Sequence, residues 1–428
     1  MMAKKQKNHK VSGHPEIRKG LTEFLKITVA YQFTDGVKKR RDPTASGWRL
    51  CGGTHFLVTV EIHKSQIMLS EIIERRLGHA GLNRKEIDAI IWEEIVRLIS
   101  DVKERNSEEK LKEAVKRILE AIDTGSTEHH TQFFQCRAVR SLASLKPLVV
   151  GPVSILDKAA LDKEVKTLGD DEMGWSEWPG NFIWRVETQC GRSSSRAQAE
   201  WAIDICCGIF TIVGEDALPF DFYRAGWQLA HPMDQQESLR EEKVIRDGRL
   251  CREIGMDRYC FTFDERFVDQ LSVNDTRDKI ALLFLEDFDS VGGRLGIALG
   301  WLARGLYASN SETRLLFFST ALETILVAGR EGVTDQLARN AACVLTDDNA
   351  TRGKFAILLR EFYQLRSTLV HEGDRRVYRS EVNNMESITI DICHRIWVKA
   401  DLSMSFDNFG KNLKNCSFGT PMQWHEDS

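Results

Sequence analysis

The chain has 428 residues, of which 42% are hydrophobic and 29% are charged, and its formal net charge is −4 at pH 7. This length favours two or three domains, and the composition is typical of a globular protein with a sizeable core. The small acidic excess excludes a protein whose whole surface is basic, so any binding of nucleic acid must be local.

The sequence also argues against membrane and secretory classes. It contains no run of eighteen apolar residues, and its first ten residues have no apolar core. The ten cysteines include no Cys-x-x-Cys pair, which favours reduced thiols in a cytoplasmic protein. We therefore expect a cytoplasmic protein that contacts no membrane and uses no metal or cofactor.

The N-terminal part is expected to mix helices and strands. Residues 1–20 are basic and predict a disordered arm that is either solvated or in contact with phosphates. Residues 21–275 predict one α+β region or two. Within them, 170–192 hold three tryptophans and indicate a loop with packed aromatic side chains. Strand-like runs span 24–33, 55–62 and 133–155, helical periodicity spans 66–77 and 85–122, and 201–213 indicate a further buried element.

From residue 276 onward the pattern is helical. The expected fold class is therefore α+β, with a mixed α/β N-terminal region followed by an all-α bundle over 276–402. Residues 403–428 are expected to form a loosely attached tail. The predicted helices are 279–308, 312–328, 334–346, 351–371 and 379–400.

Three of these helices bring polar residues into apolar surroundings. Segment 312–328 is almost wholly apolar except for Arg314 and Glu323. Because an unpaired buried charge is very costly, the Glu323 carboxylate needs a partner. Polar residues in similar settings on the next two helices are Arg339, Tyr363 and Arg366.

Segment 351–371 ends within the motif Arg366-Ser-Thr-Leu-Val-His371-Glu-Gly373. Histidine can both take and give protons near neutrality, and arginine offers a fixed charge and planar donors to a phosphate. Such a pair could cleave RNA without a metal. The helix is expected to bury Phe355, Leu358, Leu359, Phe362, Leu365, Leu369 and Val370.

In order and spacing, these motifs resemble an Apea-like HEPN domain, of the HEPN ribonuclease superfamily, over about residues 280–400. One position departs from the pattern, because Ser367 follows Arg366 where catalytic members of the family often carry Asn, Asp or His. The similarity rests on Ala321-Leu-Glu323, Leu337-Ala-Arg339-Asn-Ala-Ala and Phe362-Tyr363-Gln-Leu-Arg366-Ser-Thr-Leu-Val-His371-Glu-Gly373.

The resemblance implies a compact helical bundle that forms a homodimer and places two Arg/His sets at a shared cleft. It also implies a metal-independent endoribonuclease, commonly a toxin or an antiviral protein that acts by abortive infection. The expected substrate is RNA, such as tRNA or another structured RNA. The N-terminal region would then sense an invader-derived trigger, for example a protein, or regulate the nuclease.

Each residue of the motif has an expected role. His371 would deprotonate the ribose 2′-hydroxyl or protonate the leaving 5′-oxygen, and Arg366 would stabilise the charged phosphorane. Glu323 would orient Arg366 or His371. Tyr363 would support the backbone or stack on a base, and the further supporting residues are Ser367 and Arg339.

Helix geometry limits how these groups can meet. Five residues turn a regular helix by about 500°, so Arg366 and His371 point about 140° apart. Either the helix frays before His371 or a second subunit completes the site. The expected products are a 2′,3′-cyclic phosphate and a 5′-hydroxyl, as the resemblance implies.

Less specific interpretations stay open. His371 could be a helix-terminal histidine that meets the helix dipole and solvent, and Arg366 with Glu323 could be a structural salt bridge. Arg314 and Arg339 fit structural roles. The bundle could be a catalytically inactive RNA-binding or dimerisation module, or the main activity could reside in the N-terminal region.

Overall fold

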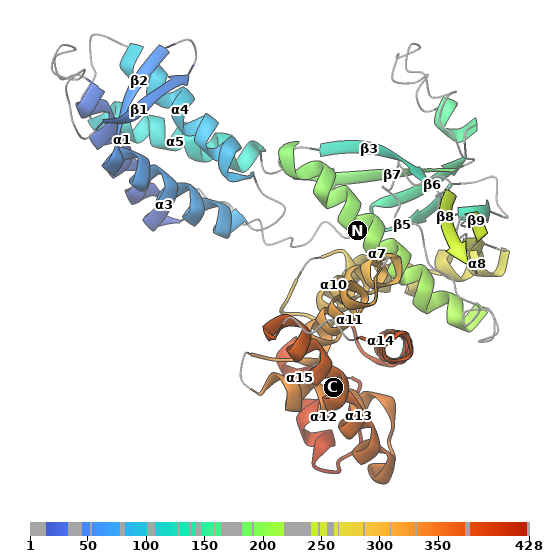
Figure 1. Cartoon of the computed structure of the whole chain (residues 1–428). Helices are drawn as coiled ribbons and strands as arrows, with labels where there is room; N and C mark the ends of the chain where they lie inside the picture. The colour runs from blue at the N-terminus through green and yellow to red at the C-terminus, as the bar shows by residue number, and fades with distance from the viewer. Residues whose placement is uncertain are drawn as a thin grey trace. The chain divides into compact units, whose positions relative to one another are not determined.

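The chain divides into two compact units in the computed structural model: 1–131 with 187–199, and 132–186 with 200–428. The predicted boundary near residue 275 does not coincide with this division. No described helix is long and apolar enough to cross a membrane. The structure describes residues 14–32, 45–51, 54–77, 82–100, 108–125, 129–136, 139–142, 147–157, 159–163, 182–190, 192–217, 241–246, 249–254, 261–263, 265–285, 287–308, 310–329, 332–372 and 377–425 (Figure 1).

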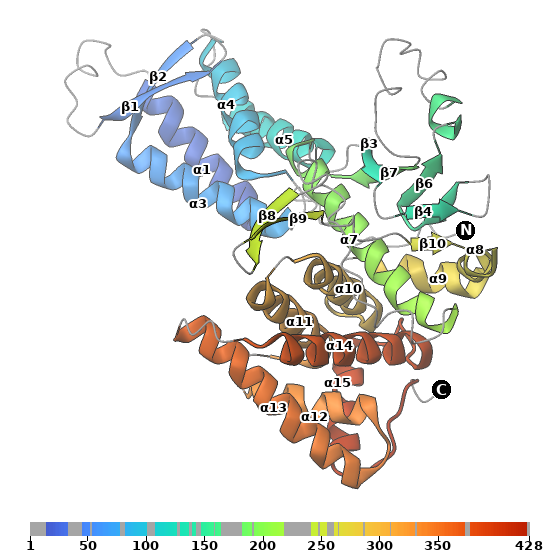
Figure 2. The same ribbon diagram turned by 45° about the vertical axis from the view of Figure 1, so that its right-hand side comes forward.

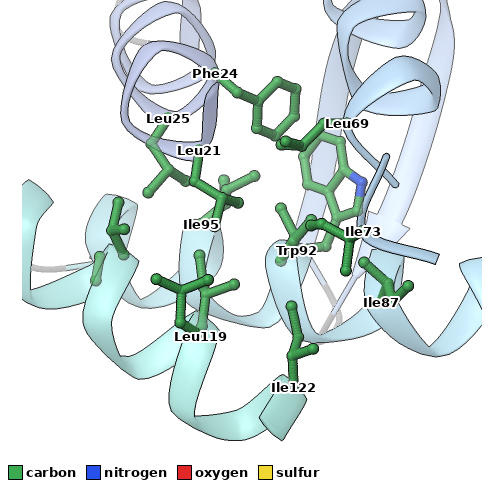
Figure 3. Close-up of a cluster of buried hydrophobic side chains, with 14 of the residues drawn as sticks. Leu21, Phe24, Leu25, Leu69, Ile73, Ile87, Trp92, Ile95, Leu119 and Ile122 are labelled. Atoms are coloured by element: carbon green, nitrogen blue, oxygen red, sulfur yellow. The ribbon is translucent and has the colours of Figure 1, made fainter. Parts of the chain in front are cut away.

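The first unit contains a helical bundle and a β-hairpin. Figure 3 shows apolar side chains from its helices converging on one core, where Leu21 and Trp92 are fully buried. Full burial of one such side chain contributes about 1.5–3 kcal/mol. The helices are α1 (Pro15–Gln32), α3 (Val60–Leu77), α4 (Arg84–Ser100) and α5 (Glu108–Gly125), and the antiparallel hairpin pairs β1 (Ala45–Cys51) with β2 (Thr54–Thr59).

Two predictions for this unit are wrong. Residues 24–32 of the run 24–33 belong to helix α1 instead of a strand, because Leu21 and Leu25 continue one buried stripe at helical spacing. Phe33 lies outside the described residues. Burial of that stripe outweighs the β propensity of the run's isoleucine, threonine and valine. The stretch 85–122 is two helices, α4 and α5, instead of one.

Two further predictions fail over part of their length. The expected disordered arm 1–20 is wrong for residues 15–20, which belong to α1, and its first thirteen residues lie outside the described ones. The strand-like run 55–62 changes structure midway, because β2 ends at Thr59 and α3 begins at Val60.

A four-stranded sheet in the order β3-β7-β6-β5 confirms the strand-like stretch 133–155. Strands β5 and β6 pair antiparallel, as do β6 and β7. The strands are β3 (His129–Cys136), β5 (Leu148–Val150), β6 (Val153–Asp157) and β7 (Phe182–Gln189), with a parallel pair β4 (Val139–Leu142) and β10 (Phe261–Phe263), and an antiparallel pair β8 (Glu241–Arg246) and β9 (Arg249–Ile254).

Helix α7 (Arg192–Ala217) contains the predicted buried element 201–213, and that prediction is confirmed. The prediction of a loop over 170–192 is wrong at Trp184. This residue lies in strand β7, where it is fully buried. Its ring stacks on that of Phe210 in α7 with centroids 6.4 Å apart. The other two tryptophans of 170–192 lie outside the described residues.

The helical pattern after residue 276 is confirmed, but the predicted helix 279–308 is two helices. The other four predicted helices agree with the observed helices to within about two residues at each end. In Figure 2, α12 and α13 lie side by side, and α14 lies along α10 and α11. The helices are α8 (Glu265–Ser272), α9 (Asn274–Leu283), α10 (Val291–Tyr307), α11 (Ser311–Leu326), α12 (Val333–Leu345), α13 (Asn349–His371), α14 (Arg379–Lys399) and α15 (Phe406–Ser417).

Helices α7 and α10 make unusually close contact. A Cβ on Gly208 would lie 2.5 Å from the carbonyl oxygen of Leu299, so glycine is required there for steric reasons. Beside this crossing, Arg304 Nε donates to Asp204 Oδ2 over 2.8 Å, and its guanidinium carbon lies 4.7 Å from the Trp201 ring. Burial raises the pKa of Asp204 to about 7, although Arg304 acts to lower it.

The prediction of a loosely attached tail over 403–428 is wrong. The first backbone N–H groups of α10, at Val291 and Gly292, donate to the carbonyls of Met404 and Leu402 over 3.0 and 2.8 Å. These bonds satisfy donors that a helix start otherwise leaves unpaired. Helix α15 then adds to the core through Phe406, Phe409, Leu413 and Cys416.

Candidate functional site

Helices α11 and α13 bring three of the predicted residues together. Glu323 Oε1 of α11 lies 3.5 Å from Arg366 Nε of α13, and the two side chains are 27% and 25% exposed. This distance exceeds the roughly 2.7–2.9 Å of a charge-assisted hydrogen bond. The contact is therefore a partly exposed ion pair between two helices.

Tyr363 is the third member of this cluster and is nearly buried, at 8% exposure. Burial, together with a hydrogen bond to Glu323, raises the pKa of Tyr363 to about 12, against the effect of Arg366. The guanidinium carbon of Arg366 lies 5.5 Å from the centre of the Tyr363 ring. At neutral pH the Tyr363 hydroxyl is therefore a hydrogen-bond donor to Glu323 and cannot act as a base.

The cluster leaves part of Arg366 available. Its ion pair with Glu323 uses Nε, and no second carboxylate among the described residues pairs with it. The two terminal nitrogens form the planar fork that suits a phosphate. Glu323 and Tyr363 thus hold the arginine by one edge while the other edge can bind an anion.

His371 lies apart from this cluster. It is exposed and is the last residue of α13, and the next N–H, of Glu372, still donates to the carbonyl of Thr368. The helix does not fray before His371, so one of the two expected ways of bringing it to Arg366 is wrong. Five residues of intact helix separate the pair by about 140° and roughly 7.5 Å along the axis.

Arg339 is not brought to the cluster either. Helix α12 runs antiparallel to α13, with Arg360 Nε pairing with Asp335 Oδ1 at 2.9 Å. Arg339, one turn further along α12, lines a cavity together with Ala356 of α13. Ten helical residues separate Ala356 from Arg366, which places Arg339 roughly 15 Å from the ion pair along α13.

Two other polar residues of these helices have different surroundings. Ser367 is partly exposed beside Arg366, and its hydroxyl forms no hydrogen bond with another described residue. Arg314 of α11 is nearly buried and pairs with Glu386 of α14. This pairing agrees with a structural role for Arg314.

Much of the apolar face of α13 is uncovered, contrary to expectation. Of the seven residues expected to be buried, only Leu359 and Phe362 are. Val370, close to His371, is 47% exposed, and Ile357 is 58% exposed. The remaining, partly exposed members are Phe355, Leu358, Leu365 and Leu369.

A second feature, which no sequence motif indicates, is a cavity of about 420 Å³ at the other end of α13. Its wall includes Arg339 of α12, Arg352 of α13 and the turn at Phe418 after α15. The cavity was not foreseen because residues 403–428 were expected to be detached from the bundle. Among the described residues, no cluster of His, Cys, Asp and Glu could hold a metal ion.

Comparisons with protein-family models, curated proteins and solved structures found no match. The functional assignment therefore rests on the residues of the chain and on the geometry that places them.

Proposed function

We propose that the chain is a metal-independent endoribonuclease of HEPN type, with Arg366, His371 and Glu323 as the residues that carry its activity. The observation that carries this proposal is the Glu323–Tyr363–Arg366 cluster, in which an arginine is positioned by its Nε edge. Preorganised charges aimed at a developing oxyanion are often the largest single contribution to catalysis. The helical bundle over 276–402 would be the HEPN-like domain.

In the proposed reaction the ribose 2′-oxygen attacks the adjacent phosphorus as the bond to the 5′-oxygen breaks. His371 takes the proton of the 2′-hydroxyl or gives one to the leaving 5′-oxygen. Arg366 binds the non-bridging oxygens of the phosphorane. The products are a 2′,3′-cyclic phosphate and a 5′-hydroxyl.

The proposed active form is a homodimer. Within one chain α13 is helical through His371, so Arg366 and His371 do not meet on one face. The uncovered apolar residues near that end, including Leu369 and Val370, offer a surface that a second copy could bury. Two copies related by a twofold axis would place each His371 near its partner's Arg366.

We also propose a setting for this activity. The protein would act in the cytoplasm in antiviral defence by abortive infection, cutting tRNA or another structured RNA. The region 21–275 would sense an invader-derived trigger, such as a protein, or restrain the nuclease. These assignments are supported only by the family resemblance of the bundle.

The test is RNA cleavage by the purified full chain in EDTA, with His371→Ala and Arg366→Ala beside the wild type. Arg360→Ala is the matched control, because Arg360 is exposed on the same helix and pairs with Asp335. We expect the wild type and Arg360→Ala to cut, and both other variants to lose activity by at least a hundredfold. If a chain bearing His371→Ala cuts RNA as fast as the wild type, the proposal is wrong.

A second candidate function is an inactive RNA-binding or dimerisation module. It is favoured by the position of His371, whose exposed imidazole has no ion pair or hydrogen bond with another described residue. In that case Arg366 and Glu323 would form a structural salt bridge. RNA binding and dimerisation without cleavage, in the wild type and in cells under phage challenge, would support it.

A further inference from the structure

The cavity at the N-terminal end of α13 is open to solvent and is lined by three parts of the bundle. Helix α12 forms one wall, the first turns of α13 form another, and the turn Phe418–Gly419 after α15 forms the third. Its volume of about 420 Å³ lies within the roughly 300–1,000 Å³ range of small-molecule sites. Gly419 turns the chain there with a φ of +99°, a conformation that favours glycine.

Arg352 is the fixed cation of this cavity. It is 9% exposed, and its Nε donates to the carbonyl of Thr346 over 2.9 Å. Its Nη1 donates to Asn349 Oδ1 and to the carbonyl of Cys416, both over 2.9 Å. Neutral oxygens therefore set its position without cancelling its charge.

The remaining nitrogen of Arg352 is available to a ligand. Its Nη2 forms no hydrogen bond with a described residue, and the nearest carboxylate is that of Asp347 at 3.9 Å. Asp347 is 80% exposed, so water screens its charge strongly. A buried guanidinium with one unused edge is a strong site for an anion.

Arg339 supplies a second cation to the same cavity. It is exposed at the wall and pairs with no carboxylate among the described residues. Burial and a hydrogen bond with Cys416 raise the pKa of Cys343 to about 12, while Arg352 and Arg339 both act to lower it. Two guanidinium groups from different helices therefore act on one thiol in the cavity wall.

Two more groups complete the lining. Asn349 uses its Oδ1 to accept from Arg352, which orients its Nδ2 as a donor toward Gly419, 3.9 Å from a Cβ position there. Phe418 at the rim is 78% exposed, the largest value among the exposed large apolar side chains of the described residues. An exposed aromatic ring beside paired cations suits a nucleobase attached to a phosphate.

We propose that this cavity binds a nucleoside phosphate, with Arg339, Arg352 and Asn349 on the phosphate and Phe418 stacked on the base. The phosphate belongs either to a free nucleotide or to an RNA chain. The site lies roughly 20 Å from Arg366, since fourteen helical residues separate the two arginines. It does not depend on whether the chain cleaves RNA.

The test measures binding of AMP, adenosine and a 5′-phosphorylated hexaribonucleotide to the full chain by isothermal titration calorimetry. Arg339→Gln removes the exposed cation, and Gly353→Met places a long side chain at a residue that lines the cavity. The control is Lys354→Gln, a charge loss at an exposed residue outside the cavity lining. Circular dichroism and thermal melting establish that each variant is folded.

We expect AMP to bind and adenosine to bind at least tenfold more weakly. Arg339→Gln and Gly353→Met should each weaken the binding of AMP about tenfold or more, and Lys354→Gln should bind AMP within twofold of the wild type. Tighter binding of the hexanucleotide than of AMP assigns the phosphate to an RNA chain, and weaker binding assigns it to a free nucleotide. Equal affinity for AMP and adenosine, no binding of either at millimolar concentration, or unchanged AMP affinity in both site variants would overturn the proposal.

Discussion

The two ends of α13 hold an arginine in opposite ways. At the C-terminal end, Arg366 pairs with the carboxylate of Glu323 and is 25% exposed. At the N-terminal end, Arg352 is 9% exposed and is fixed by two backbone carbonyls and an amide oxygen. A carboxylate positions an arginine and also neutralises it, whereas carbonyl oxygens position it and leave its charge in place.

The two arginines should therefore contribute differently to the stability of the fold and to the binding of a substrate. Arg352 joins the end of α12, the start of α13 and the end of α15, so its hydrogen bonds hold three helices. Arg366 joins only α11 to α13 through one long ion pair. We therefore expect the first arginine to matter for folding and the second to matter mainly for chemistry.

The largest expected effect is on stability at Arg352. Arg352→Met removes the donor from the oxygens of Thr346 and Asn349, whereas the carbonyl of Cys416 still accepts from the N–H of Gly419. The substitution should lower the free energy of unfolding by about 3 kcal/mol. Arg366→Met should lower it by about 1 kcal/mol or less. Urea unfolding of both variants measures the two values, and equal losses would contradict the comparison.

A third arginine, Arg304, extends the comparison. Its partner, the carboxylate of Asp204, is buried, whereas Arg304 itself is partly exposed. The folded-state pKa of Asp204 is about 7, above the ordinary value, so the folded chain holds a proton there that the unfolded chain has released. This contribution is fully present below about pH 4 and is lost as pH rises through 7. Between pH 5 and 8 the loss should be about 2.7 kcal/mol.

Asp204→Asn measures that contribution. The unfolding free energy of the variant relative to the wild type should rise by that amount from pH 5 to pH 8, because the amide does not titrate. A difference between variant and wild type that is independent of pH would show that Asp204 is ionised throughout this range.

Glu323→Gln tests how the exposed arginine is positioned. The substitution keeps the shape but removes the charge, so RNA cleavage should fall about tenfold if Glu323 orients Arg366. The pKa of Tyr363 should fall from about 12 toward its ordinary value, because the carboxylate is one of the groups that raise it. Absorbance titration between pH 9 and 12 reads this shift, and Glu361→Gln, at an exposed position of α13, is the control.

The smallest expected effect is at Gly353, beside Arg352. Gly353→Ala should raise the free energy of unfolding by about 0.5–1 kcal/mol, because alanine favours a helix and its Cβ meets no atom within 4 Å. Thermal melting reads the change. A loss of stability would show that a Cβ at residue 353 collides with neighbouring atoms.

The parts of the candidate site that depend on residues within single helices could be predicted from the sequence. Helices α11 and α13 follow from apolar periodicity, and a charged Glu323 in an apolar helix requires a partner, which is Arg366. The placement of Arg339 was not predictable in the same way. It depends on the register of α12 against α13, which residue spacing within one helix does not determine.

The less predictable parts of the fold involve contacts distant in sequence. Residues 24–33 read as a strand because their propensity is local, but residues 24–32 belong to α1, which buries Phe24 and Leu25 in the helical bundle. Residues 403–428 read as a tail because they are polar and contain glycine, yet Leu413 is fully buried against helices that precede it. The cavity exists only when that segment is docked.

The bonds from Val291 and Gly292 to Met404 and Leu402 also bear on the order of events during synthesis. More than a hundred residues separate the donors from their acceptors, so α10 emerges well before its first turn can be completed. Contacts of such long sequence separation form late and slow the folding of a domain. A growing chain would therefore carry Arg366 and His371 for some time before the bundle around them closes.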